Sequence, residues 1–173
     1  SSEHQNPSIK ATEAADAVLV LGEDVTNTAP RLALALRQSV RNKALELADQ
    51  ARLFHWQDAA IRNLAQDQRS PMVIVSATDT RLDDVASHRI SLSPDNIAAF
   101  AQAVAEEITN GSSNSDFEQV SEVAEILKSA KKRLIVSGSS MLNQAIVEAA
   151  KNVADAIASS QNEQEVMLSY CVP

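Results

Sequence analysis

Short, unbroken apolar runs that alternate with longer segments of helical period constrain the fold of this chain most. Three such runs are Ala17–Leu21, Met72–Val75 and Leu134–Val136. Runs of this length without polar alternation are typical of strands buried on both faces of a parallel sheet. Because helical segments separate them, the order is that of successive βαβ units. The sequence therefore predicts an α/β fold, a doubly wound, mainly parallel sheet with helices on both faces.

The first part of the chain carries clear helix signals. Pro30 suits the first turn of a helix, and apolar residues then recur at intervals of three or four residues, which predicts one helix over 30–47. Residues 54–66 form a second helical stretch, and the alternation around 90–92 predicts a short strand. Ser93 and Pro94 then begin a helix that continues to Ile108.

A polar segment, residues 110–114, separates this part from a second α/β segment. Ser115 and Glu118 have the spacing of a capping box, which predicts a helix start at Ser115. The helix continues through Leu127, and a strand, a helix over 142–157 and a terminal strand from Val166 follow. We expect either one sheet or two lobes, a Rossmann-like lobe over 1–110 and the start of a second over 115–173.

The terminal strand ends without a cap, and no initiator Met is present. Exposed edge strands are normally blunted by charge or proline. We therefore expect a piece of a larger subunit, with a mature protein trimmed at its end as the alternative.

Composition excludes several classes of function. Lys and Arg number 15 against 23 Asp and Glu, and the net charge of −8 repels nucleic acid and anionic lipid. The single cysteine, Cys171, can form neither an internal disulfide nor the thiolate set of an iron–sulfur cluster or a Cys-rich zinc site. No apolar run approaches the ~18 residues that span a bilayer, and the start of the chain lacks a signal-peptide pattern. We expect no nucleic-acid partner and no direct membrane insertion.

Ligands of open α/β sheets bind beyond the carboxyl ends of the strands, so these ends hold the candidate sites. After the first strand, Gly22 is the only glycine where a dinucleotide fingerprint needs three, and Glu23 and Asp24 repel phosphate. After the third apolar run, Gly138 and its serines lack the second glycine of a nucleophile elbow. We interpret the segments at Gly22 and Gly138 as ordinary turns at strand ends. The alternative is a nucleotide-binding module that uses them.

The end of the Met72–Val75 run offers Ser76, Asp79, Arg81 and two further carboxylates. Carboxylates can bind a divalent cation, but the spacing does not match a calcium loop, and pairing of Arg81 with Asp79 or Asp84 accounts for them equally well. A solvated loop is the interpretation.

Two further groups of side chains have structural interpretations. His4, His55 and His88 lack a ligand partner at helical spacing, so they are interpreted as surface or packing residues. The basic run 131–133 follows a predicted helix and complements the negative end of its dipole.

Three segments, in this order, resemble the molybdopterin-oxidoreductase-like region of the G subunit of bacterial NADH:quinone oxidoreductase. They are residues 14–38 with Leu-Gly-Glu-Asp-Val-Thr-Asn-Thr at their centre, residues 79–86 with Asp-Thr-Arg-Leu-Asp-Asp, and residues 130–138 with Lys-Lys-Arg-Leu-Ile-Val-Ser-Gly. Each motif is weak alone, and the ordered set covers residues 13–153. The resemblance identifies the chain as a middle segment of that large domain.

The resemblance implies that iron–sulfur clusters lie elsewhere in the parent subunit and that this segment holds no cofactor. In working molybdopterin enzymes, the strand ends that match Gly22, Glu23, Asp24 and Ser76 help to hold the pterin nucleotide. Those enzymes carry Asp-Pro-Arg where this chain has Ser-Ala-Thr at 76–78, and Pro-Gly-Thr-Asp where it has Pro-Asp-Asn at 94–96. The vestigial site that the resemblance implies consists of Gly22, Glu23, Asp24, Ser76, Asp79, Arg81 and Gly138.

By the same resemblance, the chain is expected to be a non-catalytic, structural part of the hydrophilic arm of a complex that transfers electrons from NADH to quinone. Its partners are the remainder of its own subunit and the other subunits of the hydrophilic arm. Its place is the cytoplasmic side of the bacterial inner membrane. The alternative is a nucleotide- or pterin-binding module that uses the Gly22 and Gly138 strand ends.

Overall fold

The described part of the chain forms one parallel sheet. A computed structural model describes residues 6–55, 60–61, 68–160 and 165–171. Within these ranges the strand order is β3-β2-β1-β4-β5, and every neighbouring pair is parallel. The predicted fold class is therefore confirmed. The strands are β1 (Ala17–Leu21), β2 (Met72–Ser76), β3 (His88–Ser91), β4 (Lys132–Gly138) and β5 (Glu165–Cys171).

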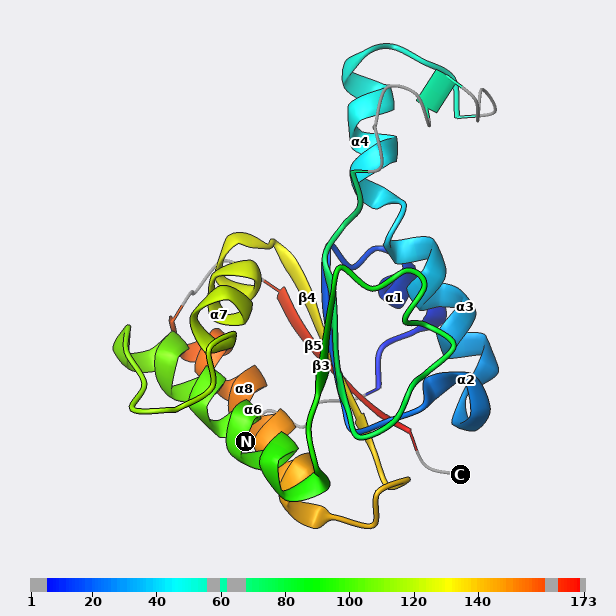
Figure 1. The fold of residues 1–173 in the computed structure, drawn as a ribbon. Coiled ribbons are helices and arrows are strands. Elements are labelled where there is room, and N and C mark those ends of the chain that lie inside the picture. Colours follow the sequence, from blue (N-terminus) through cyan, green and yellow to red (C-terminus); the bar gives the residue numbers. More distant parts are fainter. Residues whose placement is uncertain (1–5, 56–59, 62–67, 161–164, 172–173) are drawn as a thin grey trace.

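Helices cover both faces of this sheet (Figure 1). On one face lie α6 (Pro94–Asn110), α7 (Val120–Ser129) and α8 (Gln144–Ser160). The other face is covered by α1 (Ile9–Glu13), α2 (Val25–Thr28) and α3 (Pro30–Ser39), while α4 (Asn42–Gln50) extends away from the sheet. The layers follow from the alternating order of apolar runs and helical segments, since each crossover places a helix on a face.

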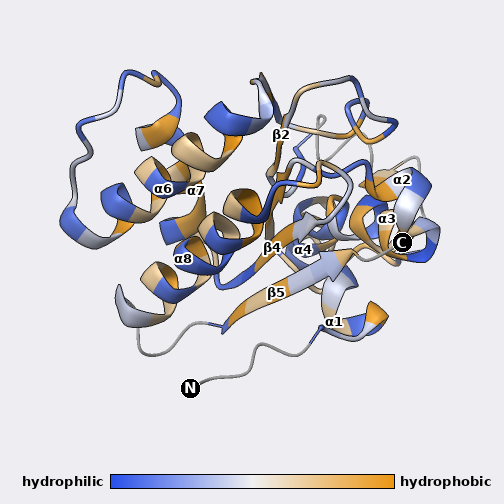
Figure 2. Ribbon diagram, turned by 90° about the horizontal axis from the view of Figure 1, so that it is seen from below, coloured by the Kyte–Doolittle hydropathy of each residue, from blue (hydrophilic) through white to orange (hydrophobic). Residues whose placement is uncertain are grey.

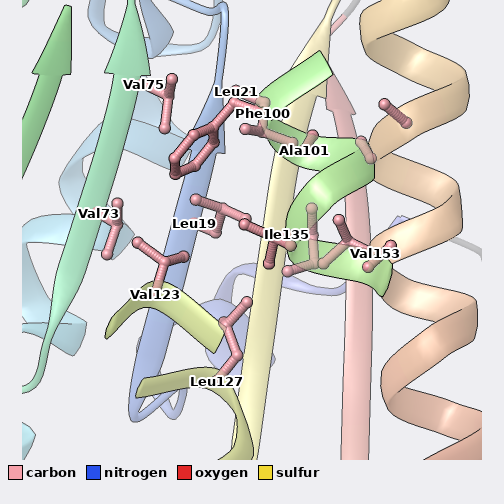
Figure 3. Close-up of a cluster of buried hydrophobic side chains, with 14 of the residues drawn as sticks. Leu19, Leu21, Val73, Val75, Phe100, Ala101, Val123, Leu127, Ile135 and Val153 are labelled. Carbon is pink, nitrogen blue, oxygen red and sulfur yellow. The ribbon is translucent and has the colours of Figure 1, made fainter. Parts of the chain in front are cut away.

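Burial on both faces explains the unbroken apolar runs. All five residues of β1 and of β2 are buried. Leu19 and Leu21 point into the cluster under α6, α7 and α8, where Phe100 is fully buried (Figure 3). Val18 and Val20 point into the opposite cluster. Helices that cover the sheet alternate apolar and hydrophilic residues around their axes (Figure 2), as amphipathic helices do.

The helix predicted over 30–47 is wrong, because the structure divides it. Helix α3 ends at Ser39, whose hydroxyl donates a hydrogen bond to the Leu36 carbonyl at 2.8 Å. Helix α4 begins at Asn42, whose side-chain amide donates to the carbonyls of Glu13 (2.9 Å) and Ala15 (2.8 Å). Contacts between residues distant in sequence thus set the direction of α4. The hydrophobic periodicity of residues 30–47 carries no information about such contacts. Most of the helix predicted over 54–66 lies outside the described residues.

The capping box predicted at Ser115 and Glu118 is also wrong. Helix α7 begins only at Val120, and the buried Ser115 hydroxyl makes no hydrogen bond within the described residues. Between them, Phe117 packs edge-on against Phe100, with ring centroids 5.6 Å apart and an interplanar angle of 74°. The partly buried Phe117 ring thus packs on the core just before α7 begins.

Other boundaries agree with the predictions. Pro30 and Pro94 occupy the first turns of α3 and α6, although the Ser93 side chain makes no cap hydrogen bond. Gly111 ends α6 with φ +73°, a left-handed conformation that glycine adopts without strain. The strands expected at 90–92 and at the end of the chain are β3 and β5.

The two expected segments share this sheet. Residues 17–21 of the first segment pair in register with residues 133–137 of the second, so β1 and β4 are neighbours. The division into a lobe over 1–110 and another over 115–173 stays a prediction. At the sheet edge, the Asn6 side chain bonds the backbone of Tyr170 in β5, accepting from its N–H at 2.8 Å and donating to its carbonyl at 3.5 Å.

One residue of the basic run 131–133, Arg133, bonds to the carboxyl end of α7. Arg133 is fully buried, and its guanidinium donates from Nε to the Leu127 carbonyl (2.5 Å) and from Nη2 to the Lys128 carbonyl (2.9 Å). These are carbonyls of the last helical turn, which lack helical partners. Burial lowers the pKa of Arg133, and the Asp16 carboxylate opposes that shift.

Candidate functional site

The strand order locates the candidate site between β1 and β4. From β1 the chain proceeds to β2 and β3 on one side, whereas β4 and β5 lie on the other. Ligands of open α/β sheets bind at such a point, beyond the carboxyl ends. Gly22 directly follows β1 and Gly138 is the last residue of the adjacent β4, so the structure brings together the two strand ends that sequence reasoning singled out.

Glu23 occupies the space between these strand ends. Its side chain comes from the loop after β1, and the residue is 1% exposed. Thr28 Oγ1 donates to Oε1 at 2.7 Å, the Ser140 backbone N–H donates to Oε2 at 3.3 Å, and the Ser140 hydroxyl also donates to Oε1. The carboxylate is thus removed from water and held by three donors from α2 and the loop after β4, as a buried charge requires.

The two glycines let other groups approach closely. A Cβ on Gly138 would overlap Glu23 Oε2 and lie 2.7 Å from the Cys171 carbonyl oxygen. Gly22 has φ +64°, and a Cβ there would meet Ile146 Cδ1 at 3.1 Å and Met141 Cγ at 3.5 Å. Side chains of this chain therefore fill the crevice, and the alternative of a nucleotide-binding module is not favoured.

Asp24 and Ser76 bond locally. One carboxylate oxygen of Asp24 accepts from the Asn27 side-chain amide at 2.6 Å, and Asp24 precedes α2 without a side-chain cap. Ser76 is buried at the end of β2, and its hydroxyl donates to the Thr78 carbonyl at 2.5 Å. Local turn formation accounts for both sets of bonds.

Asp79 and Arg81 belong to a second network, formed with α3 and β3. The predicted pairing of Arg81 with Asp79 or Asp84 is wrong: Arg89 pairs with Asp79, and Arg37 pairs with Asp84 at 2.8 Å. Among contacts between described residues, Arg81 takes part through its backbone carbonyl alone, which accepts from Arg37. The Arg37 guanidinium lowers the pKa of Asp84, since it stabilises the carboxylate form. The prediction failed because the arginines that pair with these carboxylates come from α3 and β3, outside the loop, and only the tertiary structure brings them there.

The vestigial pterin-nucleotide site remains a proposal. Gly22, Glu23 and Gly138 meet at one point, whereas the contacts of Asp79 and Arg81 lie with α3 and β3. Among the residues that the structure describes, no group of three or more His, Cys, Asp or Glu side chains is placed to hold a metal ion. His55 and His88 each contact a single carboxylate, of Asp49 at 2.6 Å and Glu122 at 2.9 Å, and His4 lies outside the described residues.

Within the described ranges, none of the helices combines the length and the apolar character that crossing a membrane requires.

Sequence reasoning missed Thr28, Ser140 and Cys171. It interpreted Glu23 as an acid that repels phosphate but did not predict that the carboxylate lies inside the crevice. The available signal was Gly138, one of only three glycines, at the end of a buried strand. Such a glycine indicates that another group approaches the backbone closely, but not which group.

The Cys171 thiol should be inert in the folded protein. Cys171 is 4% exposed, and burial together with the nearby Glu23 carboxylate raises its pKa from 9.0 to about 11, despite a hydrogen bond with Thr28. The raised pKa lowers the thiolate fraction, and the greater nucleophilicity of the more basic thiolate offsets part of that loss. The shift should therefore slow labelling by an aromatic disulfide at pH 8 about tenfold relative to the unfolded chain. Equal rates with and without urea would contradict the burial of this thiol.

Comparisons with known proteins identify relatives. No protein-family model matches the chain. The chain is 39% identical, over 96% of its length, to the NADH-quinone oxidoreductase G subunit of Pseudomonas fluorescens. It is 41% identical over 94% of its length to the G subunit of Shewanella oneidensis, and 38% identical over 87% to that of Escherichia coli K12. It spans 19%, 18% and 17% of these proteins, respectively.

Identity of this size over nearly the whole chain agrees with the resemblance carried by residues 13–153. The likeness concerns about one fifth of the relatives' length. We conclude that this chain is homologous to a segment of the NADH-quinone oxidoreductase G subunit.

Proposed function

We propose that this chain is a structural part of the G subunit of an NADH-quinone oxidoreductase, without a redox centre of its own. The homology supports membership of that subunit. The observation that carries the structural role is the filled crevice: the point where an open α/β sheet binds its ligand holds the buried carboxylate of Glu23. A negative charge at this point disfavours the phosphates of a pterin nucleotide or a dinucleotide.

In this proposal the partners are the remainder of the parent protein and the other hydrophilic-arm subunits of the complex. Iron–sulfur clusters lie in other parts of the parent protein, and electrons pass from NADH to quinone through those parts. The segment lies on the cytoplasmic side of the bacterial inner membrane. Its vestigial pterin site comprises the strand ends at Gly22, Ser76 and Gly138.

A segment exchange tests the assignment. We expect an Escherichia coli G subunit whose matching segment is replaced by this chain to assemble and to keep most of its NADH:quinone reductase rate in membranes. The reason is the homology of the two segments, since in this proposal the segment has only to fold and pack. The control carries Gly138→Ala in the exchanged segment and should accumulate less complex. If the hybrid protein accumulates but forms no complex, the proposal is wrong.

Ligand titration tests the structural role separately. The 173-residue chain should show no saturable binding of a pterin nucleotide or of NADH by calorimetry. Saturable micromolar binding of either compound, or any turnover of NADH, would contradict the structural role while leaving membership of the oxidoreductase untouched.

A further inference from the structure

We propose that the crevice between β1 and β4 is a carboxylate-binding site whose ligand is the chain's own Glu23 side chain. The donors around it resemble those that proteins use for small oxyanions: two hydroxyls and one backbone N–H converge on a single carboxylate. They come from α2 and from the loop after β4, whereas the ligand comes from the loop after β1. The site is therefore assembled by tertiary structure and is filled from within.

The space for this ligand is built into the backbone. Gly138 leaves the room that Glu23 Oε2 occupies, since any Cβ there would overlap that oxygen. Thr28 Oγ1 donates to the carboxylate at 2.7 Å while it lies 3.1 Å from the Asp24 carbonyl oxygen. With Glu23 removed, the hydroxyls of Thr28 and Ser140 and the Ser140 N–H would face an empty, polar cavity. Buried donors left without an acceptor are costly, which favours entry of an anion or of water.

Glu23→Ala removes a CH2–COO⁻ group, which has the heavy atoms of acetate. Acetate is therefore the probe that restores what the substitution deletes. We expect a Kd on the order of 10 mM, because a four-atom ligand makes few contacts and must be immobilised. Acetamide has nearly the same shape without the charge, and chloride has the charge without the two oxygens. Neither should replace the deleted carboxylate.

The thermal unfolding midpoint gives the first readout. At constant ionic strength, acetate at ten times its Kd should raise the Tm of the Glu23→Ala chain by about 4 °C. Acetamide and chloride should not raise it. Wild type and Glu23→Gln, whose crevices stay filled, should show no specific response to acetate. The double variant Glu23→Ala/Thr28→Val keeps the shape of Thr28 without its donor and should bind acetate more weakly.

Cys171 gives a second readout at the same site. Its thiol is near the Glu23 carboxylate, which contributes to its raised pKa. Removal of that carboxylate should speed the labelling of Cys171 in Glu23→Ala, and acetate at ten times its Kd should slow it again toward the wild-type rate. Acetamide should leave the rate unchanged.

Two results would overturn the proposal. One is a Tm response to acetate that is equal in wild type and Glu23→Ala; the other is a response to acetate and acetamide alike. If Glu23→Ala is unfolded in plain buffer, its circular dichroism is titrated with both compounds: refolding by acetate alone supports the site, and refolding by neither refutes it. These outcomes do not depend on whether the chain assembles into the oxidoreductase.

Discussion

Arg133→Ala should lower the free energy of unfolding by about 3–5 kcal/mol. The side chain is fully buried and donates to the carbonyls of Leu127 and Lys128. Its truncation leaves these carbonyls without those donors at the end of α7 and opens a cavity in a packed layer. The measurement is urea unfolding followed by circular dichroism, with the slope compared to confirm a common unfolded state.

Lys132→Ala is the matched control for Arg133. Lys132 is the preceding residue of β4, its side chain is exposed, and its backbone N–H keeps its bond to Asp16 at 2.8 Å. We expect a change within about 0.5 kcal/mol. Arg133→Met, which fills much of the volume without donating, should fall between the two variants. A loss in Arg133→Ala no larger than that in Lys132→Ala would show that the guanidinium does not hold α7.

Gly138→Ala should lower the free energy of unfolding by about 3 kcal/mol, the upper end of the range for overpacking a core. The added Cβ would overlap Glu23 Oε2 and lie 2.7 Å from the Cys171 carbonyl oxygen, which belongs to the backbone of β5 and cannot rotate away. The same chemical unfolding experiment measures the loss. Glu23→Ala in the same chain should recover only part of it, because the second contact remains.

Gly111→Ala is the comparison for Gly138→Ala. Gly111 has a left-handed φ of +73°, but a Cβ there would meet nothing within 4 Å. Its substitution should cost about 1 kcal/mol, from backbone strain alone. If the two substitutions lowered the free energy of unfolding equally, the crevice at Gly138 would have space for a Cβ, contrary to the packing described above.

The local sequence pattern predicted the sheet well, because strands that are buried on both faces consist of unbroken apolar runs. The unbroken runs at 17–21, 72–75 and 134–136 are strands, and Pro30 and Pro94 start helices as predicted. The features that the pattern did not predict depend on contacts with residues distant in the sequence. The break before Asn42 depends on carbonyls of Glu13 and Ala15, and the late start of α7 accompanies the packing of Phe117 on Phe100.

The candidate site, too, was predicted only in part. Its position at the strand ends followed from topology, and Gly22 and Gly138 do lie at the ends of adjacent strands. The burial of Glu23 did not follow, since its partner Ser140 is 117 residues away and carries no motif. An acid beside a strand-end glycine has the same local sequence whether it faces solvent or an interior pocket. Only the pairing of β1 with β4 distinguishes the two cases.

The pairing of β1 with β4 also bears on how the chain acquires its structure. Val18 meets its β2 partner at Met72, but its β4 partner only at Leu134. During synthesis, one hydrogen-bonding edge of the central strand must wait until most of the chain has been made. Contacts so remote in sequence slow folding, and an open edge is prone to wrong pairing in the meantime. Between the synthesis of β2 and that of β4, the half-sheet therefore exposes the unpaired backbone of β1 along one edge.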